Sequence, residues 1–159
     1  MHWAASYIGL PWSATGDGPE SFHCWALVRH VQREQFSRSL PEIPNPDDLL
    51  SIAKSFRDHP ERRRWDLVEI PEEGDCVLMR QARYPVHVGV WLEVDAGRVM
   101  HVVRDKGVVA QSRDSLAAHG WRIEGFYRFR PESERPFMGL TARDARLPGC
   151  LSAKPTVRP

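Results

Sequence analysis

Few cysteines occur in this sequence, and none of them forms a Cys-x-x-Cys pair. Three cysteines at unrelated spacings argue against a disulfide framework and a closed structural zinc motif, and they indicate synthesis in a reducing compartment. A cationic start followed by an apolar run is also absent, and no segment approaches the roughly 20 apolar residues of a membrane span. We therefore expect no secretory signal, no membrane span and a cytoplasmic location at synthesis.

An excess of either charge sign is missing as well, because 22 Lys and Arg residues stand against 21 Asp and Glu residues. Such a balance gives no basic field for nucleic acid and no polybasic signal for a membrane surface. The length of 159 residues is typical of one domain, with a hydrophobic core large enough to be stable without disulfides or a structural metal ion. We expect this domain to span residues 1–130, followed by an irregular, proline-containing extension over residues 131–159.

A cysteine opens the first helix that the hydrophobic periodicity predicts. We expect this helix to begin after Ser21, as its N-cap, and to end near Phe36. Cys24 in the first turn would lie near the positive end of the helix dipole, which favours the nucleophilic thiolate. A small apolar cysteine that faces the core is the other interpretation of the same position. The apolar face of this helix consists of Cys24, Leu27, Val28 and Val31.

Two histidines, His87 and His101, lie in neighbouring strand patterns that a hairpin turn joins over residues 94–97. In the first of these strands, alternation separates an aliphatic face from the face that carries His87. We expect both imidazole rings on the face toward the cysteine helix, where a base for the thiol is needed. The second ring could orient the first through its other nitrogen, as the third member of a triad does. A metal site at Cys24, His87 and His101 ranks below this interpretation, because the spacings match no closed zinc motif.

The remaining pattern places helices first and strands after them. A second helix is expected after Asn45-Pro46, with His59-Pro60 as its end, and a short one over residues 114–119. Helices followed by a strand meander favour an α+β fold, in which the cysteine helix packs on an antiparallel sheet. The expected strands cover about residues 65–70, 75–80, 86–93, 98–103, 108–112 and 122–130.

Five short motifs follow one another along the chain, namely Tyr7–Trp12, Phe22–Arg29, Pro71–Asp75, His87–Trp91 and Val99–His101. In this order they resemble the NlpC/P60 cysteine peptidases, and the resemblance extends over residues 3–130 or so. The chain resembles the phage-tail branch of that family in particular, through the segments Cys24–Arg29, Leu40-Pro41 and Gly125–Arg128.

The resemblance implies a papain-like fold, with N-terminal helices packed on a five- to six-stranded antiparallel sheet. It implies a cysteine endopeptidase or amidase that hydrolyses peptide bonds in bacterial cell-wall peptidoglycan, without a cofactor. In such an enzyme Cys24 would be the nucleophile, His87 the base and His101 the orienting residue. Peptidoglycan stem peptides would be the substrate, and phage tail proteins would be candidate partners of a protein of phage or prophage origin. Lysis, a phage tail or a partner would bring it to the wall.

Two positions depart from the family pattern, and both concern the site. The family usually has an aspartate before the cysteine and a tyrosine twelve residues before it, where this chain has His23 and Trp12. We expect both residues in the substrate- or oxyanion-binding part of the site, although an indole N–H donates a hydrogen bond and accepts none. A protonated His23 would support the thiolate, whereas a neutral one would help little. The departures favour the alternative of a catalytically impaired tail-assembly or wall-binding module with the same fold.

Overall fold

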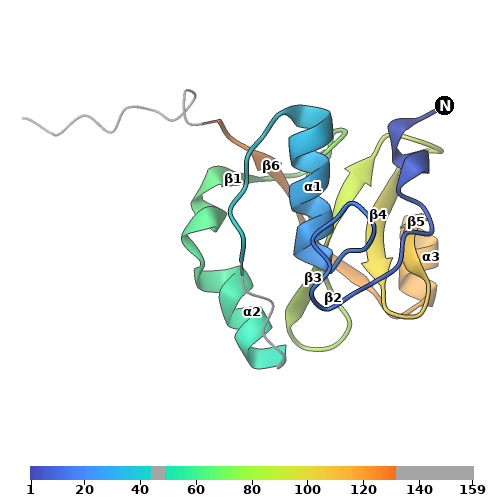
Figure 1. Ribbon diagram of the computed structural model, residues 1–159. Coiled ribbons are helices and arrows are strands. Elements are labelled where there is room, and N and C mark those ends of the chain that lie inside the picture. Colours follow the sequence, from blue (N-terminus) through green and yellow to red (C-terminus); the bar gives the residue numbers. More distant parts are fainter. Residues whose placement is uncertain (44–48, 132–159) are drawn as a thin grey trace, which may run out of the picture.

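The computed structural model describes residues 1–43 and 49–131 (Figure 1). Within these residues, six strands form one antiparallel sheet in the order β1-β6-β2-β3-β4-β5. The expected α+β fold with a five- to six-stranded antiparallel sheet is therefore confirmed. The elements are α1 (Cys24–Phe36), α2 (Leu49–Asp58), β1 (Trp65–Val68), β2 (Cys76–Arg80), β3 (Pro85–Leu92), β4 (Arg98–Val103), β5 (Gly107–Gln111), α3 (Arg113–Ala118) and β6 (Arg122–Phe129), with short 3-10 helices at Trp3–Ser6 and Pro60–Arg64.

The helix α1 lies across one face of the sheet (Figure 1), because its apolar side meets an aliphatic sheet face. Leu27, Val28 and Val31 are fully buried and share one core with Val88 and Val90 of β3. Burying each of these side chains contributes about 1.5–3 kcal/mol relative to leaving it exposed. The expected apolar face of the cysteine helix is thus confirmed.

His23, and not Ser21, caps the N-terminus of α1. The Nδ1 atom of His23 accepts a hydrogen bond from the backbone N–H of Ala26 at 3.4 Å. Ser21 is too early in the chain to serve, because the next residue, Phe22, still pairs its backbone with the loop at Trp12 in a β-bridge. A residue in a bridge cannot adopt the helical conformation of a first turn, so the helix begins after His23.

The other elements follow the sequence pattern closely. The first helix ends at Phe36 and α2 ends just before His59-Pro60, as expected. The turn over residues 94–97 between β3 and β4 is the expected hairpin. The cap expected at Asn45 lies outside the described residues, as does the expected C-terminal extension from residue 132 onward.

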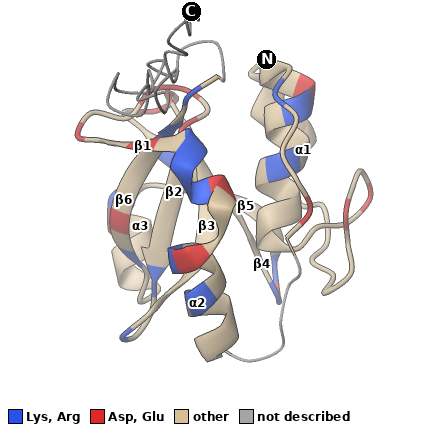
Figure 2. Ribbon diagram, turned by 90° about the vertical axis from the view of Figure 1, so that its left-hand side faces the viewer, with Lys and Arg blue, Asp and Glu red and all other residues tan. Residues whose placement is uncertain are grey.

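The second face of the sheet carries a smaller core. Trp91 of β3 points away from α1 into this core, and Leu116 brings α3 onto the same face. The helices α1 and α3 therefore cover opposite faces of the sheet (Figure 2). Acidic and basic residues are interspersed along the ribbon in this view, and no helix in the described part of the chain is long and apolar enough to cross a membrane. The buried members of this core are Val77, Met79, Trp91, Val99, Leu116 and Phe126.

Candidate active site

Cys24 is the first residue of α1, where the backbone N–H groups have no partner within the helix. Burial raises the pKa of its thiol, while the nearby backbone N–H groups of Val88, Trp25 and Cys24 itself lower it. Desolvation therefore opposes the thiolate that the helix start was expected to favour. The thiol is protonated at neutral pH and needs a base before it can act as a nucleophile.

His87 and His101 form the first link of a hydrogen-bonded relay. The Nε2 atom of His87 lies 2.9 Å from the Nδ1 atom of His101. On the other side of the second ring, His101 Nε2 lies 2.7 Å from Gln111 Oε1. The amide nitrogen of Gln111 donates to the Ser115 hydroxyl at 2.9 Å. The relay thus runs from β3 through β4 and β5 into α3.

This relay fixes the tautomer of both neutral rings. An amide oxygen only accepts hydrogen bonds, so His101 donates from Nε2 to Gln111 and keeps a bare Nδ1. His87 then donates from Nε2 to that atom, which leaves the lone pair of His87 on Nδ1. Within residues 1–43 and 49–131, His87 Nδ1 has no hydrogen-bond partner. The ring is therefore prepared to accept a proton at this atom.

Both imidazoles are neutral at physiological pH. Burial, with a smaller contribution from His101, lowers the pKa of His87 to about 3. Burial also lowers the pKa of His101, although the hydrogen bond that its Nε2–H donates to Gln111 raises it. His101 is fully buried, and His87 is 8% exposed. The resting site therefore pairs a thiol with a neutral imidazole, which is the form of the ring that can act as a general base.

The imidazole rings lie on the α3 side of the sheet. The ladder between β3 and β4 ends at Val90 and Met100, and the rings of His87 and His101 meet just beyond it. Trp121 stacks on His87 there, with 4.5 Å between the ring centroids. The prediction that both rings face the cysteine helix is therefore wrong. The aliphatic face of β3, with Val88 and Val90, packs against α1. His87 alternates with these residues and therefore lies on the opposite face, which Trp91 shares.

Cys24 and His87 nevertheless line one cleft of about 780 Å³. The cysteine reaches it from the start of α1, and the histidine reaches it from the start of β3. No hydrogen bond joins the thiol to either imidazole among the described residues. A peptide carbonyl in this cleft would meet a thiol, a base and the N–H groups of a helix start. Besides aliphatic side chains, the lining holds the polar and aromatic residues Trp12, His23, Gln81, Arg104, Asp105, Lys106, Gln111, His119 and Trp121.

The two unusual residues of the sequence, Trp12 and His23, both line this cleft. Burial lowers the pKa of His23, and its Nδ1 accepts the capping bond from α1. A protonated Nδ1 would be a donor and could not accept this bond, so the structure favours the neutral His23 that gives the thiolate little help. Trp12 has the guanidinium of Arg104 over its ring, 4.8 Å from the ring centroid.

Sequence reasoning missed three residues of the site, namely Gln111, Ser115 and Trp121. For Gln111, strand alternation was a weak indication in the sequence. Val109 pairs with His101 across the β4–β5 ladder, and Gln111 is two residues further along the same strand face. No signal indicated that α3 would supply a hydroxyl group, because that contact depends on how the helix folds back. The described residues hold no group of three or more His, Cys, Asp or Glu side chains arranged for a metal ion.

The buried imidazoles make the stability of the protein depend on pH. His87 titrates near 6.5 when unfolded, whereas its pKa in the folded protein is about 3. The unfolded chain therefore binds more protons between these two values. The free energy of unfolding should fall as the pH is lowered through this window, by up to roughly 1.4 kcal/mol per pH unit for this one group. Thermal unfolding followed by circular dichroism between about pH 7 and pH 4 measures the slope.

The matched variant for this measurement is His87→Gln, which can still donate to His101 and does not titrate. It should flatten the pH dependence of the unfolding free energy by about one proton. An unchanged slope would show that His87 is not a buried neutral group in the folded protein.

The chain is similar to known proteins in its sequence and in its fold. A family model described as "NlpC/P60 family" matches residues 9–123, which is more than half of the chain. Among solved structures, the NlpC/p60 domain of the peptidoglycan hydrolase SagA matches with a TM-score of 0.54 and 18% sequence identity. The match covers 79% of this chain and 92% of the SagA chain, and the expected papain-like fold is confirmed. No curated protein matches the chain.

Proposed function

Because this chain belongs to the NlpC/P60 family, we propose that it is a cysteine peptidase that hydrolyses peptide bonds in bacterial cell-wall peptidoglycan. The observation that carries the proposal is the relay from Gln111 through His101, which leaves a bare nitrogen on His87 in the cleft that Cys24 lines. The fold shared with a domain of a peptidoglycan hydrolase supports the substrate class. Residues 1–130 form the catalytic domain in this proposal, and residues 131–159 form an extension of it.

The proposed reaction begins when Cys24 Sγ gives its proton to His87 Nδ1 and attacks the carbonyl carbon of the scissile bond. The carbonyl oxygen gains the negative charge, which the backbone N–H of Cys24 stabilises at the positive end of α1. His87 then gives the proton to the amide nitrogen, the C–N bond breaks, and the acyl group stays on sulfur as a thioester. His87 next takes a proton from water, whose oxygen releases the acyl group as a carboxylic acid and restores the thiol.

His101 and Gln111 act through His87 and touch no reacting atom. The base must take a proton at Nδ1 and return it from the same atom, so its ring has to keep one tautomer and one orientation. His101 provides both by accepting from His87 Nε2. Gln111 in turn keeps His101 in the tautomer that can accept. We therefore regard both as positioning residues of the proposed peptidase.

The test is digestion of purified muropeptides, with the products identified by mass spectrometry. We expect pairs of fragments whose masses add up to the parent muropeptide plus one water, which identifies hydrolysis of a peptide bond. The fragments also identify the bond, because each stem-peptide position yields a different pair. Intact muropeptides with the wild-type protein, under conditions in which it is folded, would contradict the proposal.

A second candidate function is a catalytically impaired wall-binding or tail-assembly module. Two observations favour it. Trp12 contacts the Arg104 guanidinium through its ring and has no phenol hydroxyl to offer the site. His23 caps α1 and brings no acidic charge to the cysteine. Such a module would sediment with insoluble peptidoglycan and release no fragments. A peptidase would release fragments in the same assay.

A phage or prophage origin is part of the proposal. The motifs Cys24–Arg29, Leu40-Pro41 and Gly125–Arg128 support it through their resemblance to the phage-tail branch. The protein would be made in the cytoplasm and carried to the wall by lysis, by a phage tail or by a partner. Copurification with tail proteins from an induced lysate tests this part separately from the chemistry.

A further inference from the structure

An arginine with no acid partner lies at the rim of the catalytic cleft. Arg104 and Lys106 both line the cleft that holds Cys24 and His87, and both are exposed. Neither forms an ion pair with a described residue, and the acid between them, Asp105, forms none either. By contrast, eight other arginines have carboxylate partners, namely Arg29, Arg33, Arg57, Arg64, Arg80, Arg98, Arg128 and Arg130.

The guanidinium of Arg104 is held in place by Trp12. Its central carbon lies 4.8 Å from the centroid of the indole ring. Such a cation–π contact uses the flat face of the guanidinium and leaves the N–H groups at its edge free to donate. Those N–H groups match the two oxygens of a carboxylate, which they can bind in a bidentate manner.

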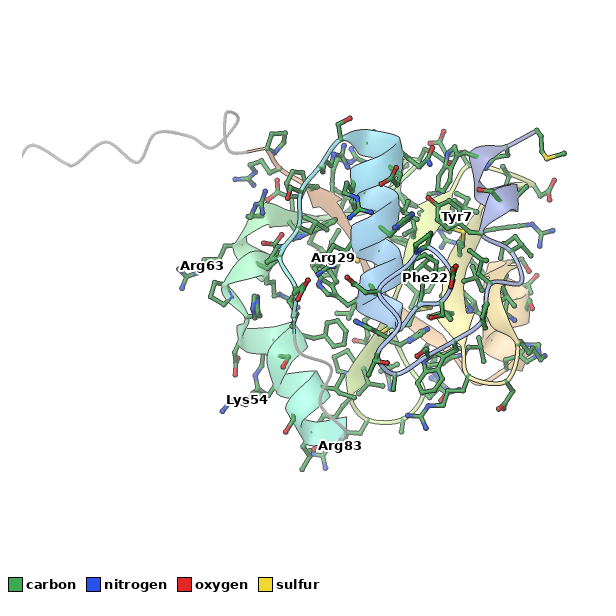
Figure 3. All side chains as sticks on the ribbon, viewed as in Figure 1. Tyr7, Phe22, Arg29, Lys54, Arg63 and Arg83 are labelled. Atoms are coloured by element: carbon green, nitrogen blue, oxygen red, sulfur yellow. The ribbon has the colours of Figure 1, made fainter. Side chains whose placement is uncertain are left out.

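The tryptophan that carries this contact is itself firmly positioned. The backbone N–H of Ser13 donates to the Phe22 carbonyl at 3.0 Å, and the Phe22 N–H donates to the Pro11 carbonyl at 3.1 Å. The fully buried ring of Phe22 packs between Tyr7 and the first helix (Figure 3). Trp12 therefore sits in a loop whose backbone is bonded on both sides to a residue of the core.

The turn that carries Arg104 is joined to the same N-terminal segment. The backbone N–H of Gly9 donates to the Val108 carbonyl at 2.9 Å, and the Val108 N–H donates to the Leu10 carbonyl at 2.8 Å. Gly107, just before Val108 in this turn, has a φ of +71°, and a Cβ there would lie 2.3 Å from the Leu10 carbonyl oxygen. Only glycine therefore allows the two segments to approach so closely. Backbone hydrogen bonds thus join the segments that carry Trp12 and Arg104, and both residues line the cleft that Cys24 lines.

We propose that Trp12 and Arg104 bind a carboxylate of the stem peptide, with Lys106 adding positive charge at the same rim. The inference rests on the proposed function, because peptidoglycan stem peptides are short chains with free carboxylates. It gives Trp12 a role in substrate recognition in place of a role at the oxyanion. Amidation of the bound carboxylate removes the charge that the cleft recognises.

The test measures binding and not turnover, so that it is independent of the chemistry. The Cys24→Ala protein is titrated by calorimetry with the synthetic peptide L-Ala-γ-D-Glu-L-Lys-D-Ala. Two further peptides carry an amide at the α-carboxylate of the D-Glu residue or at the C-terminus. We expect one of the amides to bind at least about tenfold more weakly than the parent peptide. Adding Arg104→Gln to the protein should remove that difference, because the affinity for the parent peptide should fall to the affinity for the amide.

Control variants separate recognition from a loss of structure. Arg83→Gln changes an exposed arginine that stacks on Tyr84 outside the cleft, and it should keep the full preference for the carboxylate. Trp12→Phe retains an aromatic platform and should keep most of the preference, whereas Trp12→Leu should lose it at a similar melting temperature.

The outcomes also distinguish this inference from the proposed function. Equal binding of all three peptides, or a preference that survives Arg104→Gln, would overturn the carboxylate site and leave the peptidase intact. If none of the three peptides binds while muropeptides are still hydrolysed, the recognition of the stem carboxylates is likewise refuted. If no peptide binds and no muropeptide is hydrolysed, both proposals fail together.

Discussion

Hydrolysis of muropeptides should stop when Cys24 is replaced by alanine. No thioester can form without the sulfur, so we expect the rate to fall by roughly 10⁴-fold or more. The assay follows product fragments by mass spectrometry over a time long enough to detect such a residual rate. The fold should persist, because Cys24 is at the end of a helix whose packing rests on Leu27, Val28 and Val31.

Cys76→Ala is the matched control for this experiment. Cys76 is a buried residue of β2, and burial, followed by the neighbouring Cys24 and Asp75, raises the pKa of its thiol to about 12. Such a thiol is inert, so its loss should leave the rate nearly unchanged and cost about 1 kcal/mol of stability. Equal rates for the wild-type protein and Cys24→Ala would exclude covalent catalysis and support the wall-binding alternative.

The second large effect is expected along the relay, and it should decrease with distance from the thiol. His87→Ala should be nearly as severe as the loss of the nucleophile, because the thiol then loses the base that the relay orients. His101→Ala should be milder, roughly tenfold to a thousandfold, because this ring orients the base and carries no proton to the substrate. Gln111→Leu should be milder still. Single-turnover rates with one defined muropeptide compare the three variants.

A pH profile separates orientation of the base from a general loss of structure. In Gln111→Glu a carboxylate would accept from His101 and raise the pKa of both rings, so the acidic limb of the rate profile should move to higher pH. Gln81→Leu alters another glutamine of the same cleft, whose amide donates to the His119 carbonyl, and it should leave the profile in place. Wild-type rates and profiles in His101→Ala and in both Gln111 variants would show that the relay has no part in catalysis.

Local periodicity was sufficient to predict most of the fold. The face of α1 that carries Leu27 and Val31 and the alternation of β3 are both properties of short segments, and the structure has them as expected. The adjacency of His87 and His101 also followed from the sequence, because one hairpin turn joins their strands. These predictions needed no knowledge of how distant parts of the chain meet.

The parts that could not be predicted depend on contacts between distant segments. The loop at Trp12 keeps Phe22 in a bridge and moves the helix cap from Ser21 to His23. The two imidazoles lie on the sheet face opposite to α1, because α1 packs on the other face. Strand alternation separates the two faces but does not predict which of them α1 covers. Gln111 became part of the site through the register of β4 and β5, which no single segment contains.

The pairing of residues 9 and 10 with Val108 has a consequence for solubility. The strand β5 is the last in the sheet, and its outer side would otherwise present unpaired backbone groups as a template for another chain. The hydrogen bonds of Gly9 and Leu10 to Val108 occupy part of this edge. We therefore expect the N-terminal segment to limit edge-to-edge aggregation. Deletion of residues 1–10 would expose the unpaired backbone edge of β5 to other chains. A shortened form of this protein should therefore retain these residues.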